Sequence, residues 1–302
     1  MILSSGGKTL CYHITFLRPG AVMLRVCLLV LLLSVGLPVQ SGVNLVTTIQ
    51  PLTLLVQPLL AEGDQITQLL PANQSPHHFA LSVSQRRALA DADLILWIGP
   101  DLEAALAPLL EGSGAALEMA GIAGIEWPVG GSQHHGDHQH GLDPHLWMNP
   151  GNARVMVSAI EAALVAARPS QAAHYRQQGQ AFRDRLAQTD AAIRARLEKP
   201  AKYISFHDAY GHWNRHFGSQ QLAAVGSTPE QKPSARHLYA LQKLAPEAEC
   251  LLAESLYANQ NSESLARQLR LPLVMADPLG QAADSYEALL LNLAQVFEAC
   301  HR

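Results

Sequence analysis

Short apolar runs alternate with helical patterns in the first third of the chain. Apolar runs bounded by turn-forming residues predict strands at residues 45–49, 65–70 and 93–98. Apolar positions at helical spacing predict helices at residues 51–61, 82–92 and 101–111. Strands that alternate with helices in this way predict a mainly parallel sheet with helices on its faces.

The middle of the chain has a different pattern. From about residue 149 to 197 the sequence is rich in Ala, Arg, Gln and Leu at helical spacing and is broken once, at Pro169. Proline fits the first turn of a helix, so a second helix is expected from about residue 170 to 197. At 1.5 Å per residue it would be roughly 40 Å long and could span the molecule. A coiled-coil partner helix is the alternative, but no clean heptad repeat runs through it.

After Pro200 the alternation returns, with strands expected at residues 202–206, 221–225, 250–254 and 271–276, and a last helix from about Ser285. The predicted fold class is therefore α/β, with two lobes, each a mainly parallel sheet flanked by helices, joined by a long backbone helix. The expected boundaries are an N-terminal lobe at 43–168, a linker helix at 169–199 and a C-terminal lobe at 200–302.

The first 41 residues form an expected leader. From Met23 the sequence has one arginine, an apolar run over residues 26–33, and then Pro38 and small residues, which permits cleavage after Ser41. A membrane anchor is the alternative, but the apolar run is shorter than the ~20 residues that span a bilayer. Residues 1–22 fit neither a signal nor a fold, so Met23 is the expected natural start.

The cysteines and the composition narrow the compartment and the class of partner. Cys27 precedes most of the leader's apolar run, so no lipid anchor is expected, and we predict an exported, periplasmic protein. Cys250 and Cys300 then predict a disulfide, which could contribute roughly 4 kcal/mol by closing a loop of about 50 residues; soft metal ligands are the alternative. The chain of 302 residues is 48% hydrophobic with a net charge of −4, which permits a large core and gives no support to a nucleic-acid partner.

Histidine is the outlier of the composition, with 14 residues, and three of them end predicted elements or precede one. His77 follows the second strand, His145 precedes a helix, and His207 ends the first strand of the second lobe. Asp277 ends the last strand of that lobe. Ligands of α/β sheets tend to bind beyond the carboxyl ends of strands. Three imidazoles and an oxygen suit Zn²⁺, whereas Mn²⁺ or Fe²⁺ would favour more oxygen ligands.

Four motifs, SPHHF, DPHLWMNPGNARVM, FHDAYGHWNRHFG and ADPLG, occur in this order across both lobes. With these gaps they resemble the zinc-binding proteins that feed ABC-type metal importers, the ZnuA-like branch. The resemblance runs from about residue 45 to 300 and includes the terminal cysteine pair. It implies two α/β lobes on a long backbone helix with the metal held in the cleft between them.

The resemblance also implies which residues hold the metal. The first lobe would supply His77 and His145, and the second lobe His207. Asp277 matches the position at which manganese-binding relatives supply a carboxylate, while some zinc-binding relatives have a glutamate just before the first histidine, where this chain has Pro76. The fourth ligand is therefore open between Asp277, water and another carboxylate. His78 is the alternative to His77, which is preferred because it follows SP.

The remaining histidines are expected outside the main site. An expected loop at residues 132–142 contains His134, His135, His138 and His140. The resemblance implies that this loop is an auxiliary zinc-binding segment that raises the local zinc concentration. The alternative is a polar insertion without a function. His212 and His216 have the i,i+4 spacing of a zinc pair, but no glutamate follows His212 as in H-E-x-x-H, so a solvated helix face is expected.

Two further residues have expected roles near the site. Glu254 ends a predicted buried strand and could bind the second nitrogen of a ligand histidine, or serve structure alone. Trp147 is expected to pack in the core.

The predicted function is the capture of Zn(II) in the cleft and its delivery to the membrane permease of an ABC transporter, by a monomer that is not an enzyme. A Mn(II)- or Fe(II)-binding protein of the same family is the first alternative. A zinc-dependent hydrolase is less well supported because no general-base motif or nucleophile elbow is present, and an adhesin on the same fold is a third class. Because the histidines must be unprotonated, metal affinity should fall as the pH drops through about 6.5.

Overall fold

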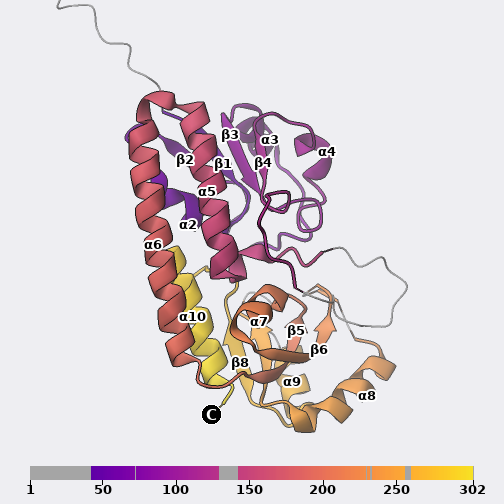
Figure 1. The fold of residues 1–302 in the computed structure, drawn as a ribbon. Coiled ribbons are helices and arrows are strands. Elements are labelled where there is room, and N and C mark those ends of the chain that lie inside the picture. The colour runs from indigo at the N-terminus through magenta and orange to yellow at the C-terminus, as the bar shows by residue number, and fades with distance from the viewer. Residues whose placement is uncertain are drawn as a thin grey trace, which may run out of the picture. The chain divides into compact units, whose positions relative to one another are not determined.

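The structure, a computed structural model, describes residues 42–71, 73–128, 142–228, 230–231, 233–255 and 260–301 (Figure 1). Residues 42–302 form one compact unit. The expected leader and its cleavage site lie outside the described residues. Within the described part of the chain, none of the helices combines the length and the apolar character needed to cross a membrane.

The first lobe is built on a four-stranded parallel sheet with the strand order β2-β1-β3-β4. Its strands are β1 (Asn44–Thr47), β2 (Gln65–Gln68), β3 (Leu94–Trp97) and β4 (Ala116–Glu118). The helices of this lobe are α2 (Gln50–Val56), α3 (Val83–Ala90) and α4 (Ala107–Leu110). All four side chains of β3 are buried, as expected for a central strand covered on both faces.

The second lobe repeats this topology, with the parallel order β6-β5-β7-β8. Its strands are β5 (Lys202–His207), β6 (Gln220–Gly226), β7 (Cys250–Glu254) and β8 (Leu273–Ala276). Its helices are α7 (Gly211–Phe217), α8 (Ala235–Leu244), α9 (Gln260–Leu269) and α10 (Tyr286–Ala299). The predicted fold class, with two mainly parallel sheets flanked by helices, is confirmed.

Two long helices follow the first sheet. The side chain of Asn149 accepts hydrogen bonds from the N–H groups of Gly151 and Asn152 and so caps α5 (Pro150–Ala167), with Pro150 in its first turn. A short 3-10 turn at Pro169–Gln171 reverses the chain into α6 (Ala172–Arg196). Figure 1 shows α6 running beside both α5 and α10, as their contacts require. The expected long helix is therefore present, and it packs against both the preceding helix α5 and the last helix α10.

Two sequence expectations for the first lobe need correction. The helix expected over residues 101–111 is reduced to α4, because Pro108 lacks the N–H that a longer helix would need. The turn before it is fixed instead by Glu103, whose buried carboxylate accepts from the backbone N–H groups of Ile98 and Gly99. Strand β4 was not predicted, because three half-buried residues have no distinct apolar pattern.

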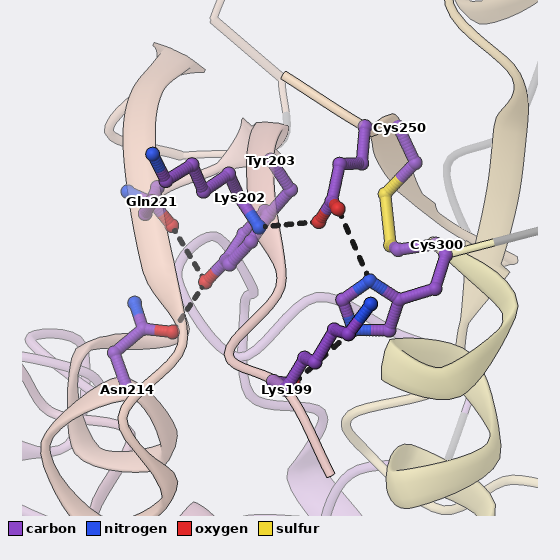
Figure 2. Close-up of a disulfide and its surroundings, with 9 residues drawn as sticks. Lys199, Lys202, Tyr203, Asn214, Gln221, Cys250 and Cys300 are labelled. Carbon is purple, nitrogen blue, oxygen red and sulfur yellow. Dashed lines mark hydrogen bonds and ion pairs between the residues drawn. A yellow bond between two sulfur atoms is a disulfide. The ribbon is translucent and has the colours of Figure 1, made fainter. Parts of the chain in front are cut away.

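The core of the second lobe is closed by a disulfide and an aromatic cluster. Cys250 at the start of β7 is bonded to Cys300 beyond the end of α10, as expected (Figure 2). One turn earlier in α10, the ring of Phe297 is stacked on Trp213 at 4.9 Å between centroids and meets Tyr203 at 5.3 Å. The hydroxyl of the buried Tyr203 donates to the Asn214 side chain at 2.7 Å, whereas the buried Nε1 of Trp213 in the same cluster has no hydrogen-bond partner.

Candidate metal centre

The candidate site lies beyond the carboxyl ends of the second sheet's central strands. In the order β6-β5-β7-β8, the connections from β5 and β7 leave toward opposite edges, and such a switch point leaves a crevice above the strand ends. His207 is the last residue of β5 and Glu254 the last residue of β7. Both side chains line a small pocket whose other walls include Pro76, His77, His145 and Trp147 from the first lobe.

Three of the predicted ligands meet at this pocket. His77 lies in the loop after β2, and His145 directly precedes the 3-10 turn at Leu146–Met148. The ring centroid of His77 lies 5.6 Å from that of His145 and 5.0 Å from that of His207. The centroids of His145 and His207 are 4.9 Å apart. One ligand nitrogen from each of the three lies within 4.8 Å of the other two. Rings gathered so closely converge on a common point.

Two of these rings are oriented by carboxylates. His207 Nδ1 lies 2.7 Å from Glu254 Oε1, and His145 Nδ1 lies 2.7 Å from Asp143 Oδ1. The same Asp143 oxygen accepts from the backbone N–H of His145 at 3.0 Å. A carboxylate holds the proton of the neutral ring on Nδ1 and leaves the Nε2 lone pair for a metal, as is usual for ligand histidines.

The unpaired atoms fit a bound cation. The Nε2 atoms of His77 and His207 are buried and have no hydrogen-bond partner. Buried polar atoms without a partner are rare in folded proteins, and each requires a reason. Two buried, unpaired imidazole nitrogens at the same pocket are suited to a metal such as Zn²⁺, which binds imidazole nitrogen at about 2.0–2.1 Å.

The protonation of the ligands differs across the site. Burial, together with repulsion from His145, His207 and His78, lowers the pKa of His77 to about 2. Burial also disfavours the charged form of His207, but the charge and hydrogen bond of Glu254 outweigh it and raise the pKa of His207. For Asp143, burial is outweighed by the hydrogen bond and charge of His145, which lower its pKa. Asp143 is therefore an anion at neutral pH, and the His77 ring is neutral.

Other predicted site residues lie outside this group of three. Asp277 follows β8, and its carboxylate accepts from the N–H of Ala282 at 3.0 Å; it is not among the residues whose ligand atoms lie within 4.8 Å of one another. His78 is exposed, whereas its neighbour His77 faces the pocket. His134, His135, His138 and His140 lie outside the described residues, as does most of the expected loop.

The expectation of a solvated face for His212 and His216 is wrong for His212. Its side chain is 0% exposed, with Nε2 at 2.9 Å from the carbonyl oxygen of Asp143 and Nδ1 at 3.1 Å from the amide nitrogen of Asn152. His216 is mostly buried and lies 2.8 Å from Asp190. Helical spacing shows which residues share a face, but it does not show that the face of α7 is covered by the chain around Asp143.

Trp147 packs in the core at 1% exposure, and its indole N–H donates to the carbonyl oxygen of Pro278 at 2.7 Å. Asp143, the partner of His145, was not predicted from the sequence. The signal was present in the motif DPH, because an aspartate two residues before a histidine can reach both its backbone N–H and its ring.

Comparison with known proteins assigns the chain to a family. Residues 45–300 match the family model ZnuA, described as zinc-uptake complex component A, periplasmic. The chain belongs to this family. It is 30% identical over 293 residues to the high-affinity zinc uptake system protein ZnuA of Yersinia pestis, which covers 86% of this chain and 92% of that protein. It is 26% identical to the protein of the same name from Haemophilus ducreyi, over 89% of this chain and 96% of the relative.

Solved structures share the fold. A crystal structure of a ZnuA superposes with a TM-score of 0.75 at 20% identity, covering 87% of this chain and 100% of that chain. The periplasmic zinc-binding protein TroA from Treponema pallidum gives a TM-score of 0.74 at 21% identity, over 86% of this chain and 99% of TroA. The ZnuA-like resemblance and the two-lobed architecture are thus confirmed.

Proposed function

We propose that the protein captures Zn(II) between its two lobes and delivers it to the membrane permease of an ABC importer. The observation that carries this proposal is the convergence of His77, His145 and His207 within 4.8 Å, with two buried Nε2 atoms left unpaired. Zinc is the cargo of such a site. Membership of the zinc-uptake family supports the same function.

The donor set favours zinc over manganese or ferrous iron. Three imidazole nitrogens form an incomplete tetrahedral site, whereas Mn²⁺ and Fe²⁺ prefer more oxygen ligands. The Asp277 carboxylate, which would make the site richer in oxygen, is engaged with the Ala282 N–H. We propose a water molecule as the fourth ligand. The second candidate function is a manganese carrier, in which Asp277 would be the fourth ligand.

The site fits a zinc-transport protein better than a zinc-dependent hydrolase. His145 and His207 are 3% and 4% exposed, so a bound ion would be enclosed between the lobes, whereas a hydrolytic zinc site needs an accessible fourth position. We place the protein in the periplasm, in keeping with the family description. We also propose that it acts as a monomer. The histidines of the 132–142 loop are proposed to be an auxiliary, weaker zinc-binding segment.

A competition titration tests the proposed function. Metal-stripped protein is offered Zn²⁺ and Mn²⁺ together at neutral pH, and bound metal is counted after gel filtration. We expect about one zinc per chain at the cleft, retained against excess manganese. His207→Ala should abolish tight binding, whereas deletion of residues 133–140 should preserve it. If the deletion abolished stoichiometric binding instead, the assignment of the main site to the cleft would be wrong.

A further inference from the structure

A buried asparagine connects the first lobe to His212 of α7. The Asn152 side chain pairs with the backbone of Glu126, accepting from its N–H at 2.8 Å and donating to its carbonyl at 3.0 Å. The same amide nitrogen lies 3.1 Å from His212 Nδ1. With one N–H committed to Glu126, the other is free to donate to His212.

The hydrogen bonds of His212 fix its tautomer. A carbonyl oxygen only accepts, so the Nε2 atom that lies 2.9 Å from the Asp143 carbonyl must carry the proton. Nδ1 then accepts from Asn152, and both ring nitrogens are satisfied in the neutral form. The ring is fully buried, with Trp127 5.6 Å away between centroids.

The residue held in this way is the one that orients a metal ligand. Asp143 accepts from the backbone N–H and the ring Nδ1 of His145. Gly211, the neighbour of His212, permits the close approach, because a Cβ at this position would lie 2.4 Å from Asp143 Oδ2. The start of α7, in the second lobe, is therefore shaped to receive the segment of the first lobe that carries His145.

We propose that His212 is a positioning residue for zinc binding, which holds the backbone of Asp143 and through it the orientation and tautomer of His145. The inference rests on the proposed function, because it concerns the affinity of the same site. It adds a specific consequence. His145, supplied by the first lobe, is aligned from the second lobe, whereas His207 is aligned by Glu254 within the second lobe.

The alternative is that His212 only stabilises the core. Comparing the effects of a substitution on His145 and on His207 distinguishes the two roles. A loss of general packing would disturb His145 and His207 alike. A positioning role would affect His145 and leave His207 intact, because Glu254 does not depend on the Asp143 segment. The ring-nitrogen shifts in two-bond ¹H–¹⁵N spectra, read through the carbon-bound ring protons, give the tautomer of each histidine separately.

The test compares His212→Ala, His212→Gln and the control His174→Ala in metal-stripped full-length protein. His174 makes the same type of bond, from Nε2 to the carbonyl oxygen of Leu60 at 2.9 Å, away from the site. Zinc affinity is measured by competition with a chelator. We expect about tenfold weaker binding in His212→Ala, recovery in His212→Gln, whose amide can donate to Asp143, and wild-type affinity in His174→Ala. In His212→Ala the spectrum of His145 should become a mixture of tautomers while that of His207 is unchanged.

Two outcomes would overturn the inference. One is wild-type affinity and an unchanged His145 spectrum in His212→Ala. The other is an equal disturbance of His145 and His207, in both variants at position 212, which would indicate general loss of packing. If wild-type protein itself retained no zinc, the proposed function would fail. The spectra of metal-free protein would still decide whether His212 positions His145.

Discussion

In the proposed ligands His145 and His207, the two nitrogens of each ring have separate tasks. Nδ1 donates to a carboxylate, Asp143 or Glu254, and Nε2 is left to bind the ion. The carboxylate that orients each ring also increases its basicity, which strengthens the metal bond and at the same time favours the competing proton. The pH dependence of zinc binding therefore reports directly on these hydrogen bonds.

The pH dependence of zinc affinity is predicted to follow His207. Zinc binds only the unprotonated ring, and Glu254 raises the pKa of His207 in the metal-free protein. Affinity should therefore begin to fall above pH ~6.5, the ordinary histidine pKa, as the solution is acidified. His77, with its pKa lowered to about 2, adds no proton competition near neutrality. Chelator competition across the neutral and mildly acidic range measures this decline.

Glu254→Gln is the matched variant for that profile. The glutamine oxygen can still accept from Nδ1 but carries no charge, so the pKa of His207 should fall and the decline of affinity should move to lower pH. In mildly alkaline solution the less basic ligand should bind zinc roughly 10- to 100-fold more weakly. An unshifted profile in this variant would show that the proton of another group controls binding.

Asp277→Asn tests the fourth ligand. Because the Asp277 carboxylate is engaged with the Ala282 N–H and lies outside the group of three histidines, we expect the substitution to leave zinc affinity nearly unchanged. Isothermal titration against a competing chelator measures the change. A loss of zinc affinity greater than about tenfold, as is typical when a residue that supports a metal site is replaced, would mean that Asp277 is the fourth ligand.

At the same scale, the sequence indicated the three histidines that the structure brings together, but not the residues that surround them. His77, His145 and His207 were proposed because each lies in a family motif beside a predicted strand or helix, and their role as ligands remains a prediction. The roles of His212 and Asn152 depend on the contact of α7 with segments 60 to 69 residues away in sequence. Neither periodicity nor composition specifies such a contact.

Among the secondary-structure elements, buried strands were predicted from the sequence, whereas a helix interrupted by proline and a very short strand were not. Buried runs such as LILW of β3 predict strands because both faces are covered. The helix expected over residues 101–111 failed at Pro108, and β4 escaped prediction because it is three residues long. Parallel pairing then brings His207 and Glu254 to the same edge, since β5 and β7 are neighbours in the sheet.

The disulfide couples two of these elements and should be needed for stability. Cys250 begins β7, whose other end carries Glu254, and Cys300 follows α10 (Figure 2). Replacing both cysteines by alanine opens a loop with a sequence separation of 50, so the free energy of unfolding should fall by about 2–4 kcal/mol. Urea unfolding of oxidised and reduced wild-type protein, beside the double variant, measures this. Equal stability of oxidised and reduced protein would contradict it.

On the scale of the whole molecule, one hydrophobic cluster joins both sheets through the long helices. It includes Leu45 and Leu96 of the first sheet, Phe182 of α6, and Tyr203 and Leu252 of the second sheet. A core shared in this way predicts that the two lobes unfold together. The lobe boundaries expected at residues 168 and 199 remain predictions.

Zinc should stabilise the whole protein. A ligand that binds only the folded state at about 100 times its Kd adds about 2.7 kcal/mol to the free energy of unfolding. For a chain of this size we expect a single calorimetric transition whose midpoint rises by roughly 4–5 °C with zinc. The His207→Ala variant serves as the control and should show no such rise. Two separate transitions, with zinc moving only one of them, would contradict the shared core.

The central claim is that one zinc ion is held by His77, His145 and His207, and anomalous diffraction at the zinc absorption edge tests it most directly. Crystals grown with one equivalent of Zn²⁺ should show a single strong anomalous peak about 2.0–2.1 Å from a nitrogen of each of the three rings. A peak located instead on the histidines of residues 134–140, or no ordered peak between the three rings, would contradict the account.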